Sequence, residues 1–110
     1  MVRAVPARGD VYLVRLDPTL GSEIRKTRPC LVVSPDELNL HLRTVMVAPM
    51  TTSGRSYSWR VSCQFQSRTG FVALDQLRAI DSERLVKLLG RLPSPTMSSV
   101  LAKLQEIFAE

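Results

Sequence analysis

The chain has 110 residues, of which 45% are apolar and 23% charged, and its formal net charge is +5. A globular composition at this length can bury one core, so it excludes a fibrous or a disordered chain. Most of the fifteen basic residues are arginines, whose planar guanidinium group suits phosphate contacts. The charge therefore indicates either a polyanionic partner or an ordinary solvated basic surface.

Cysteine usage and the N-terminal residues indicate where the protein works. Both cysteines, Cys30 and Cys63, lie in apolar stretches, and the first nine residues lack the apolar segment of a signal peptide. We expect free, buried thiols and a cytoplasmic protein. No apolar stretch approaches the roughly 20 residues of a membrane span. One histidine and no CxxC or HExxH motif argue against a zinc site, so we expect chemistry without a metal ion or cofactor.

The first elements are two strands separated by a loop. Residues 10–16 are rich in β-branched and aromatic side chains and predict a strand, whereas the polar residues 17–27 predict a long loop. Residues 29–33 form a short apolar run, which periodicity alone does not separate from a buried helix. Its β-branched content and its brevity favour a strand.

A short helix and a third strand are expected next. Ser34 fits an N-cap, Pro35 the first helical position and Glu37 the third residue of a capping box, so a helix should run to about Leu42. Residues 44–50 are again typical of a strand. A polar loop follows this strand.

Residues 57–65 carry the clearest alternation of apolar and polar side chains in the chain. A period of two predicts a half-exposed antiparallel strand. The two aromatic residues at its start, Tyr57 and Trp59, are candidates for stacking on bases. The alternation nevertheless favours their packing in the core or in a dimer interface.

The last third should contain short strands and one helix. Residues 66–70 predict a turn, and residues 71–74 and 77–80 predict strands. Residues 85–92 are ambiguous, because the leucine spacing suits a helix and the glycine does not; we interpret them as a strand after a helical turn. A final helix begins at Ser94, with a helically spaced apolar face formed by Met97, Val100, Leu101, Leu104, Ile107 and Phe108.

The order of these elements predicts the fold class. Strands with inserted helices, but without regular βαβ alternation, indicate an α+β fold: a mainly antiparallel sheet or small barrel with helices packed outside. We expect one domain that spans residues 1–110.

Three junctions between strands and loops hold the candidate site residues. Arg28 precedes a buried strand, Thr51 follows one, and Asp75-Gln76 separates two others. Folds often place active residues at such strand ends, on a rigid support. Taken singly, Arg28 reads as a surface residue, Thr51 as part of a turn, and Asp75 as a structural carboxylate that holds its own turn.

Short motifs with these residues run along nearly the whole chain. They are Asp10, Asp17-Pro18-Thr19, Gly21-Ser22-Glu23, Thr27-Arg28-Pro29, Leu31-Val32-Val33-Ser34, Pro49-Met50-Thr51-Thr52, Gly70-Phe71-Val72-Ala73-Leu74-Asp75-Gln76 and Ile80-Asp81. In order and spacing they resemble the MazF/PemK family of toxin endoribonucleases. The resemblance implies an SH3-like antiparallel barrel of the MazF/PemK/CcdB type with a C-terminal helix, and a homodimer that cleaves single-stranded RNA at short sequences. It also implies a MazE-like antitoxin whose acidic C-terminal segment covers the RNA groove.

The resemblance also implies site residues. Arg28 and Thr51 match the positions that carry the chemistry, and Asp75 matches an aspartate that some members use together with an arginine, which here is replaced by Ala73. The residues expected to contact RNA are Glu23, Arg25, Lys26, Thr27, Thr52, Ser53, Arg55 and Gln76. Of these, the basic loop residues Arg25, Lys26 and Arg55 suit the RNA backbone or, equally, solvent.

RNA supplies its own nucleophile, the 2′-OH, so cleavage requires in-line orientation, two proton transfers and stabilisation of charge on phosphorus. Arg28 suits the stabilisation and Thr51 the positioning, while the proton acceptor stays open, with Asp75 as one candidate. Products with a 2′,3′-cyclic phosphate and a 5′-OH are expected.

Two other functions compete with this interpretation. A gyrase-poisoning toxin of similar fold relies on a C-terminal segment that contains tryptophan, and residues 104–110 contain none. A non-catalytic RNA-binding module would keep the basic loops and lose nothing when Arg28 is removed.

Overall fold

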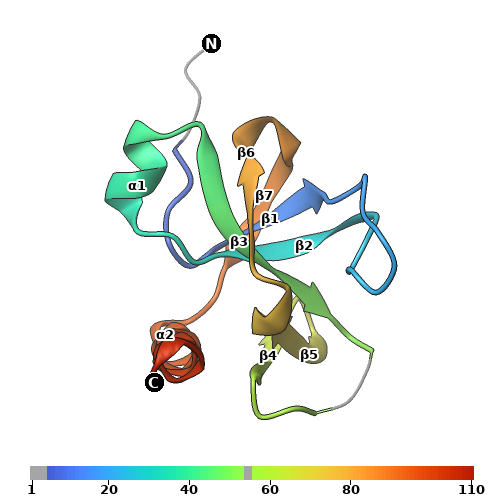
Figure 1. Ribbon diagram of the computed structural model, residues 1–110, viewed down its shortest axis with the longest axis vertical. Coiled ribbons are helices and arrows are strands. Elements are labelled where there is room, and N and C mark those ends of the chain that lie inside the picture. Colours follow the sequence, from blue (N-terminus) through green and yellow to red (C-terminus); the bar gives the residue numbers. More distant parts are fainter. Residues whose placement is uncertain (1–4, 54–55) are drawn as a thin grey trace.

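The computed structural model describes residues 5–53 and 56–110, and its strands all run antiparallel to their neighbours (Figure 1). The strands are β1 (Asp10–Arg15), β2 (Thr27–Val32), β3 (Thr44–Thr51), β4 (Arg60–Phe65), β5 (Arg68–Ala73), β6 (Arg78–Asp81) and β7 (Leu85–Arg91). The helices are α1 (Asp36–His41) and α2 (Ser94–Phe108), and single 3₁₀ turns, η1 (Leu74–Gln76) and η2 (Ser82–Arg84), precede β6 and β7.

The long strand β3 organises the sheet. The strands pair in the order β4-β5-β3-β2-β1-β7, and β6 joins β3 as well. The first half of β3 pairs with β6, and its last two residues pair with β5 (Figure 1). Because β4 and β7 stand at opposite ends of this order, the sheet forms an open half-barrel with a C-terminal helix. The predicted mainly antiparallel fold is confirmed, although the barrel is not closed.

Both faces of the sheet are packed, because successive residues of a strand point to opposite sides. One core cluster includes Leu31, Ala48, Val72 and, from α2, Val100. The other includes Val14, Cys30, Val47 and Ile80. The two cysteines are free and buried as predicted, and burial raises the pKa of the Cys30 thiol to about 12.

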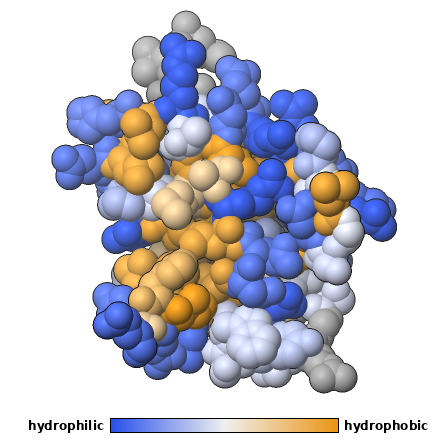
Figure 2. All heavy atoms as spheres, in the orientation of Figure 1, coloured by the Kyte–Doolittle hydropathy of each residue, from blue (hydrophilic) through white to orange (hydrophobic). Residues whose placement is uncertain are grey.

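Helix α2 covers the first cluster with the apolar face that its spacing predicted, but only along part of its length. Val100 is fully buried, and Met97 and Leu104 pack against the cluster. Ile107 and Phe108 are exposed instead, at the end of the helix. In the view of Figure 2, apolar surface follows the side of α1 and α2, and polar residues cover much of the opposite side. Neither α1 nor α2 is long and apolar enough to cross a membrane.

The start of α1 differs from the prediction. Pro35 is the N-cap and no side chain caps the helix, so the expected capping box is wrong. The end of the helix at His41, with Leu42 as the C-cap, agrees with the prediction. Ser34 is buried and turns its hydroxyl inward, where it donates to Asn39 Oδ1 and accepts from the backbone N–H of Met46 at 3.1 Å. The hydroxyl therefore joins α1 to β3 and is not available to cap the helix.

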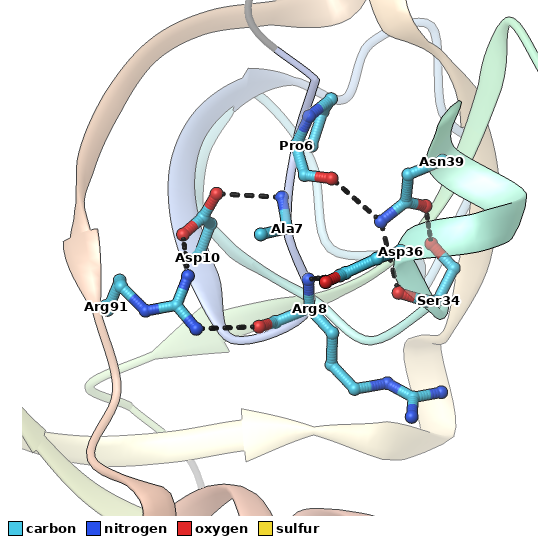
Figure 3. Close-up of polar contacts among 8 residues, drawn as sticks. All are labelled: Pro6, Ala7, Arg8, Asp10, Ser34, Asp36, Asn39 and Arg91. Atoms are coloured by element: carbon cyan, nitrogen blue, oxygen red, sulfur yellow. Dashed lines mark hydrogen bonds and ion pairs between the residues drawn. The ribbon is translucent and has the colours of Figure 1, made fainter. Parts of the chain in front are cut away.

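Asn39 completes this buried network, as Figure 3 shows. Its amide nitrogen donates to the carbonyl oxygens of Pro6 at 3.0 Å and Ser34 at 3.1 Å, so it fastens the N-terminal segment to α1. Nearby, Asp10 accepts from Arg91 and from the backbone N–H of Ala7.

Substituting Asn39→Ala should lower the free energy of unfolding by about 1–3 kcal/mol, because it leaves buried polar partners without hydrogen bonds. Urea denaturation measures this change. Glu37→Ala, an exposed position on the same helix, is the control and should have little effect. Equal stability of both variants would contradict a structural role for this network.

The strand predicted at residues 57–65 begins only at Arg60. The backbone N–H of Arg60 donates to the carbonyl of Tyr57 at 3.0 Å, which makes a turn of the preceding residues. Tyr57 and Trp59 stack on one another, and Trp59 is 41% exposed, so the expected packing in the core is wrong. The dimer-interface alternative stays a prediction.

The remaining strand predictions differ mainly at their boundaries. The turn predicted at residues 66–70 shrinks to Gln66 and Ser67, whose positive φ angles of 51° and 64° suit a two-residue hairpin loop. Residues 68–70 therefore belong to β5. The ambiguous stretch 85–92 is a strand after a helical turn, as interpreted from the sequence.

Candidate functional site

A pocket of about 250 Å³ opens where β2 begins and β3 ends, and Arg28, Thr51 and Thr52 line it. The strand register explains this proximity. Cys30 of β2 pairs with Pro49 of β3, and Arg28 and Thr51 each lie two residues beyond this pair, so both point to the same side of the sheet. The two residues predicted to carry the chemistry are thus brought to one pocket from positions 23 residues apart.

The hydroxyl of Thr51 is held by the residues that follow it. Thr51 is 7% exposed, and its Oγ1 accepts from the backbone N–H of Ser53 at 3.2 Å. The Ser53 hydroxyl lies 3.2 Å from the same atom. Ser53, predicted to contact RNA, therefore contacts Thr51 and fixes its rotamer.

Two guanidinium groups border the pocket. Arg28 donates from Nε to the carbonyl of Arg25 at 2.9 Å, and it makes no ion pair with any residue that the structure describes. This bond fixes the side chain and leaves the terminal nitrogens for a ligand. The second guanidinium is that of Arg68 in the β4–β5 hairpin. The sequence interpretation missed it, because residue 68 fell in a predicted turn.

Gly70 gives the pocket its close backbone packing. A Cβ atom at this position would lie 2.5 Å from the carbonyl oxygen of Thr51, far inside van der Waals contact. Only glycine allows β5 to approach the end of β3 in this way. Gly70 thereby positions Thr51 through the backbone.

Three other predicted residues line a neighbouring pocket of about 370 Å³: Glu23, Asp75 and Gln76. Pro49 also lines it. Because Pro49 and Thr51 lie two residues apart on one strand, they point to the same face about 7 Å apart. The two pockets adjoin on this face, but Asp75 does not line the pocket of Arg28 and Thr51.

Asp75 is bound by Arg60 of β4. The guanidinium donates from Nε to Oδ1 and from one terminal nitrogen to Oδ2, both at 3.0 Å. These hydrogen bonds lower the pKa of the Asp75 carboxyl and raise the pKa of Arg60. In the β4–β5 register Arg60 lies opposite Ala73. An arginine therefore stands beside Asp75, although residue 73 is an alanine.

The Arg60–Asp75 ion pair predicts a pH dependence of stability. The pKa of Asp75 is lower in the folded chain than its usual value near 3.8. The ion pair therefore stabilises the fold fully above pH 3.8, and this stabilisation is lost as the pH falls through the lowered pKa. Asp75→Ala should cost about 0.5–1 kcal/mol at pH 7, since the pair is partly exposed, and less at about pH 3. Urea denaturation at both pH values measures it, and a loss independent of pH would contradict the ion pair.

The remaining predicted RNA-contact residues shape or flank the loop between β1 and β2. The side-chain oxygen of Gln76 accepts a hydrogen bond from the backbone N–H of Ile24 at 3.2 Å. The Glu23 carboxylate accepts a hydrogen bond from the backbone N–H of Leu20. Arg25, Lys26 and Thr27 are exposed beside Arg28 without lining its pocket, and Arg55 lies outside the described residues. Within the described part of the chain, no three His, Cys, Asp or Glu side chains cluster as metal ligands.

Comparisons with known proteins identify the family of the chain. Residues 7–108 match the family of PemK-like, MazF-like toxins of type II toxin-antitoxin systems. The chain is 41% identical over 106 residues to the endoribonuclease PemK of Escherichia coli, which covers 91% of this chain and 80% of that one. It is 34% identical over 104 residues to the endoribonuclease EndoA of Bacillus subtilis, a match that covers 89% of this chain and 90% of EndoA.

Solved structures share the fold. MazF from Deinococcus radiodurans superposes with a TM-score of 0.85 at 26% identity, covering 96% of this chain and 97% of that one. An endoribonuclease from a mycobacterial species, solved in complex with its cognate antitoxin, gives a TM-score of 0.76 at 25% identity, covering 94% and 93%. The chain belongs to the family of PemK-like, MazF-like toxins of type II toxin-antitoxin systems.

Proposed function

We propose that this chain is an endoribonuclease toxin that cuts single-stranded RNA, including mRNA, at short sequences without a metal ion. The observation that carries the proposal is the single pocket in which Arg28, Thr51 and Arg68 meet from three different strands. Two guanidinium groups around a fixed hydroxyl suit a phosphodiester. The relatives named above as endoribonucleases support the same activity.

The proposed reaction is an internal transfer at phosphorus. The 2′-oxygen attacks the adjacent phosphorus, the bond from phosphorus to the 5′-oxygen breaks, and the products carry a 2′,3′-cyclic phosphate and a 5′-OH. The 2′-OH loses a proton and the leaving oxygen gains one. Arg28, with Arg68 beside it, stabilises the negative charge that develops on the phosphate oxygens. Thr51 turns its hydroxyl proton from the Ser53 carbonyl, 3.3 Å away, to a non-bridging oxygen and so holds the phosphate in line.

Asp75 is a poor candidate for the proton acceptor. It lines the adjoining pocket, and the two hydrogen bonds from Arg60 lower the pKa of its carboxyl. The residues that line the pocket of Arg28 and Thr51 include no carboxylate and no imidazole among those described. We therefore assign Asp75, with Arg60, a positioning role. We assign the role of proton acceptor for the 2′-OH to a water molecule at the open mouth of the pocket.

The proposed function includes two protein partners. A cognate antitoxin with an acidic segment suits the net charge of +5 and the guanidinium groups around the pocket. A second copy of the chain suits the edge strand β7, where Val86 and Leu88 are about half exposed. Sedimentation equilibrium should therefore give the mass of a homodimer.

The test is cleavage of a long single-stranded RNA by purified, antitoxin-free protein in excess EDTA. We expect cleavage at a limited set of sites, and fragments whose 5′ ends accept phosphate from a polynucleotide kinase without prior dephosphorylation. Loss of cleavage in EDTA would refute the metal-free chemistry. Intact RNA that is nevertheless bound would instead favour the non-catalytic RNA-binding module.

A further inference from the structure

Tyr57 and Trp59 form an aromatic stack on the surface beside β4. Their ring centroids are 4.7 Å apart and the ring planes differ by 9°. Trp59 is 41% exposed, although tryptophan usually buries most of its surface. The two rings are therefore already parallel, and a further flat ring can stack on the exposed side of Trp59.

The stack is fixed to the sheet. The guanidinium of Arg60 lies 5.4 Å from the centre of the Tyr57 ring, at a distance typical of a cation–π contact. The same guanidinium is held by both oxygens of Asp75 and is only 13% exposed. Arg60 is fixed on one side by Asp75 and contacts Tyr57 on the other. The aromatic side chains therefore lose little conformational entropy when a ligand binds.

Arg60, which contacts Tyr57 of the stack, lies on the same face of the sheet as Thr51 of the candidate active site. Thr51 pairs with Phe71 in β5, and Arg60 pairs with Ala73, two residues further along β5. Directly opposite residues and residues two apart share a face, so Thr51 and Arg60 belong to the same face with backbones on the order of 10 Å apart. An RNA strand that follows this face from the pocket reaches Arg60 and Tyr57, and Trp59 continues the stack around the edge strand β4 toward α2.

The outer side of the stack borders open space. Trp59 lines a shallow depression of about 210 Å³ with Ser58, Lys103, Glu106 and Ile107. Lys103 and Glu106 form an ion pair of 2.6 Å, and Ile107 adds an aliphatic wall. The aromatic surface and the aliphatic wall suit a flat base, and because the Lys103–Glu106 pair carries no net charge, the sugar and phosphate of that base remain in solvent.

We propose that Tyr57 and Trp59 form a stacking platform for an unpaired base of the RNA, a few nucleotides from the phosphate at Arg28 and Thr51. The proposal rests on the proposed RNA substrate, but not on cleavage. Stacking is tolerant of sequence, because every base has a flat face, so the platform adds affinity and not base recognition. A peptide segment of an antitoxin and a second copy of the chain are the competing occupants.

Trp59 provides its own probe, because it is the only tryptophan in the chain. The ligands are 2′-O-methyl RNA oligonucleotides, which lack the nucleophile and cannot be cut, in a short form of about three nucleotides and a long form of about nine. Binding is followed in parallel by the anisotropy of a dye on the oligonucleotide. The long form should quench Trp59 fluorescence as it saturates, and the short form should bind without this quenching.

Variants separate stacking from folding. Trp59→Ala should weaken binding of the long form about tenfold or more, since stacking on one base is worth roughly 1–3 kcal/mol, and should leave binding of the short form unchanged. Trp59→Phe keeps an aromatic face and should retain most of the affinity. Leu40→Ser, at an exposed apolar position of α1 outside the depression, controls for a change at the surface and should leave binding of the long form unchanged.

The outcomes distinguish this inference from the proposed function. Saturating binding of the long form with unchanged Trp59 fluorescence, and equal affinity of Trp59→Ala, would overturn the platform and leave the nuclease proposal intact. A smaller mass of Trp59→Ala in sedimentation, with unchanged RNA affinity, would assign the stack to an interface between copies and would also overturn it. Quenching by the long form in a chain that cuts no RNA would support the platform and sink the nuclease.

Discussion

Arg28→Ala should lower the single-turnover rate of RNA cleavage by about 10²–10³-fold, the usual cost of losing one preorganised donor to a developing charge. The chain should remain folded, because Arg28 is partly exposed and makes one side-chain hydrogen bond, to the Arg25 carbonyl. Arg28→Lys keeps the charge but loses the planar fork, so it should recover only part of the rate.

The control for this prediction is Arg25→Ala, which removes a neighbouring charge of the same loop. Arg25 is exposed and does not line the pocket, so its loss should weaken RNA binding and leave the rate at saturation nearly unchanged. Thr51→Ser should stay active and Thr51→Val should not, because only the first keeps the hydroxyl. An Arg28→Ala chain with the wild-type rate at saturating RNA would exclude Arg28 from the chemistry.

Sequence patterns predicted most strands and their succession along the chain, because a period of two and a helical repeat are local properties of the chain. Arg28 and Thr51 were singled out by the family resemblance, together with their place where two strands meet loops. Their position in one pocket depends on the β2–β3 register, which cannot be deduced from the sequence pattern of either strand alone. For this reason the site was predicted as residues and not as a geometry.

The parts that the sequence did not predict depend on contacts between distant residues. The Arg60–Asp75 ion pair joins residues 15 apart through the β4–β5 register, and no local signal in β4 marks Arg60. Serine is a preferred N-cap residue, but Ser34 is buried, and its hydroxyl bonds to Asn39 and to the backbone of β3 instead. Trp59 fitted the alternation of the following strand, yet the turn at Tyr57–Arg60 moved it to the surface.

Gly70→Ala should impair catalysis without touching any side chain of the pocket. The added Cβ would lie 2.5 Å from the Thr51 carbonyl oxygen and 3.5 Å from the Cα of Thr52, so the end of β3 must move away from β5. Both neighbours are backbone atoms, which cannot rotate aside. A displacement of about 1 Å at a positioned group can lower a rate by 10²-fold, and we expect a loss of that order. Stability should fall by about 1–3 kcal/mol, as for other overpacked sites.

Gly9→Ala separates the two effects, because it strains the backbone far from the pocket. Gly9 has a φ of 98°, and a Cβ there would lie 3.2 Å from the Arg91 side chain. This control should also be less stable, yet it should cleave RNA at the wild-type rate per folded molecule. Rates are therefore compared at a temperature where urea or thermal unfolding shows all three chains to be folded. If Gly70→Ala keeps the wild-type rate there, the position of Thr51 does not limit catalysis, and the hydroxyl loses its proposed role in holding the phosphate in line.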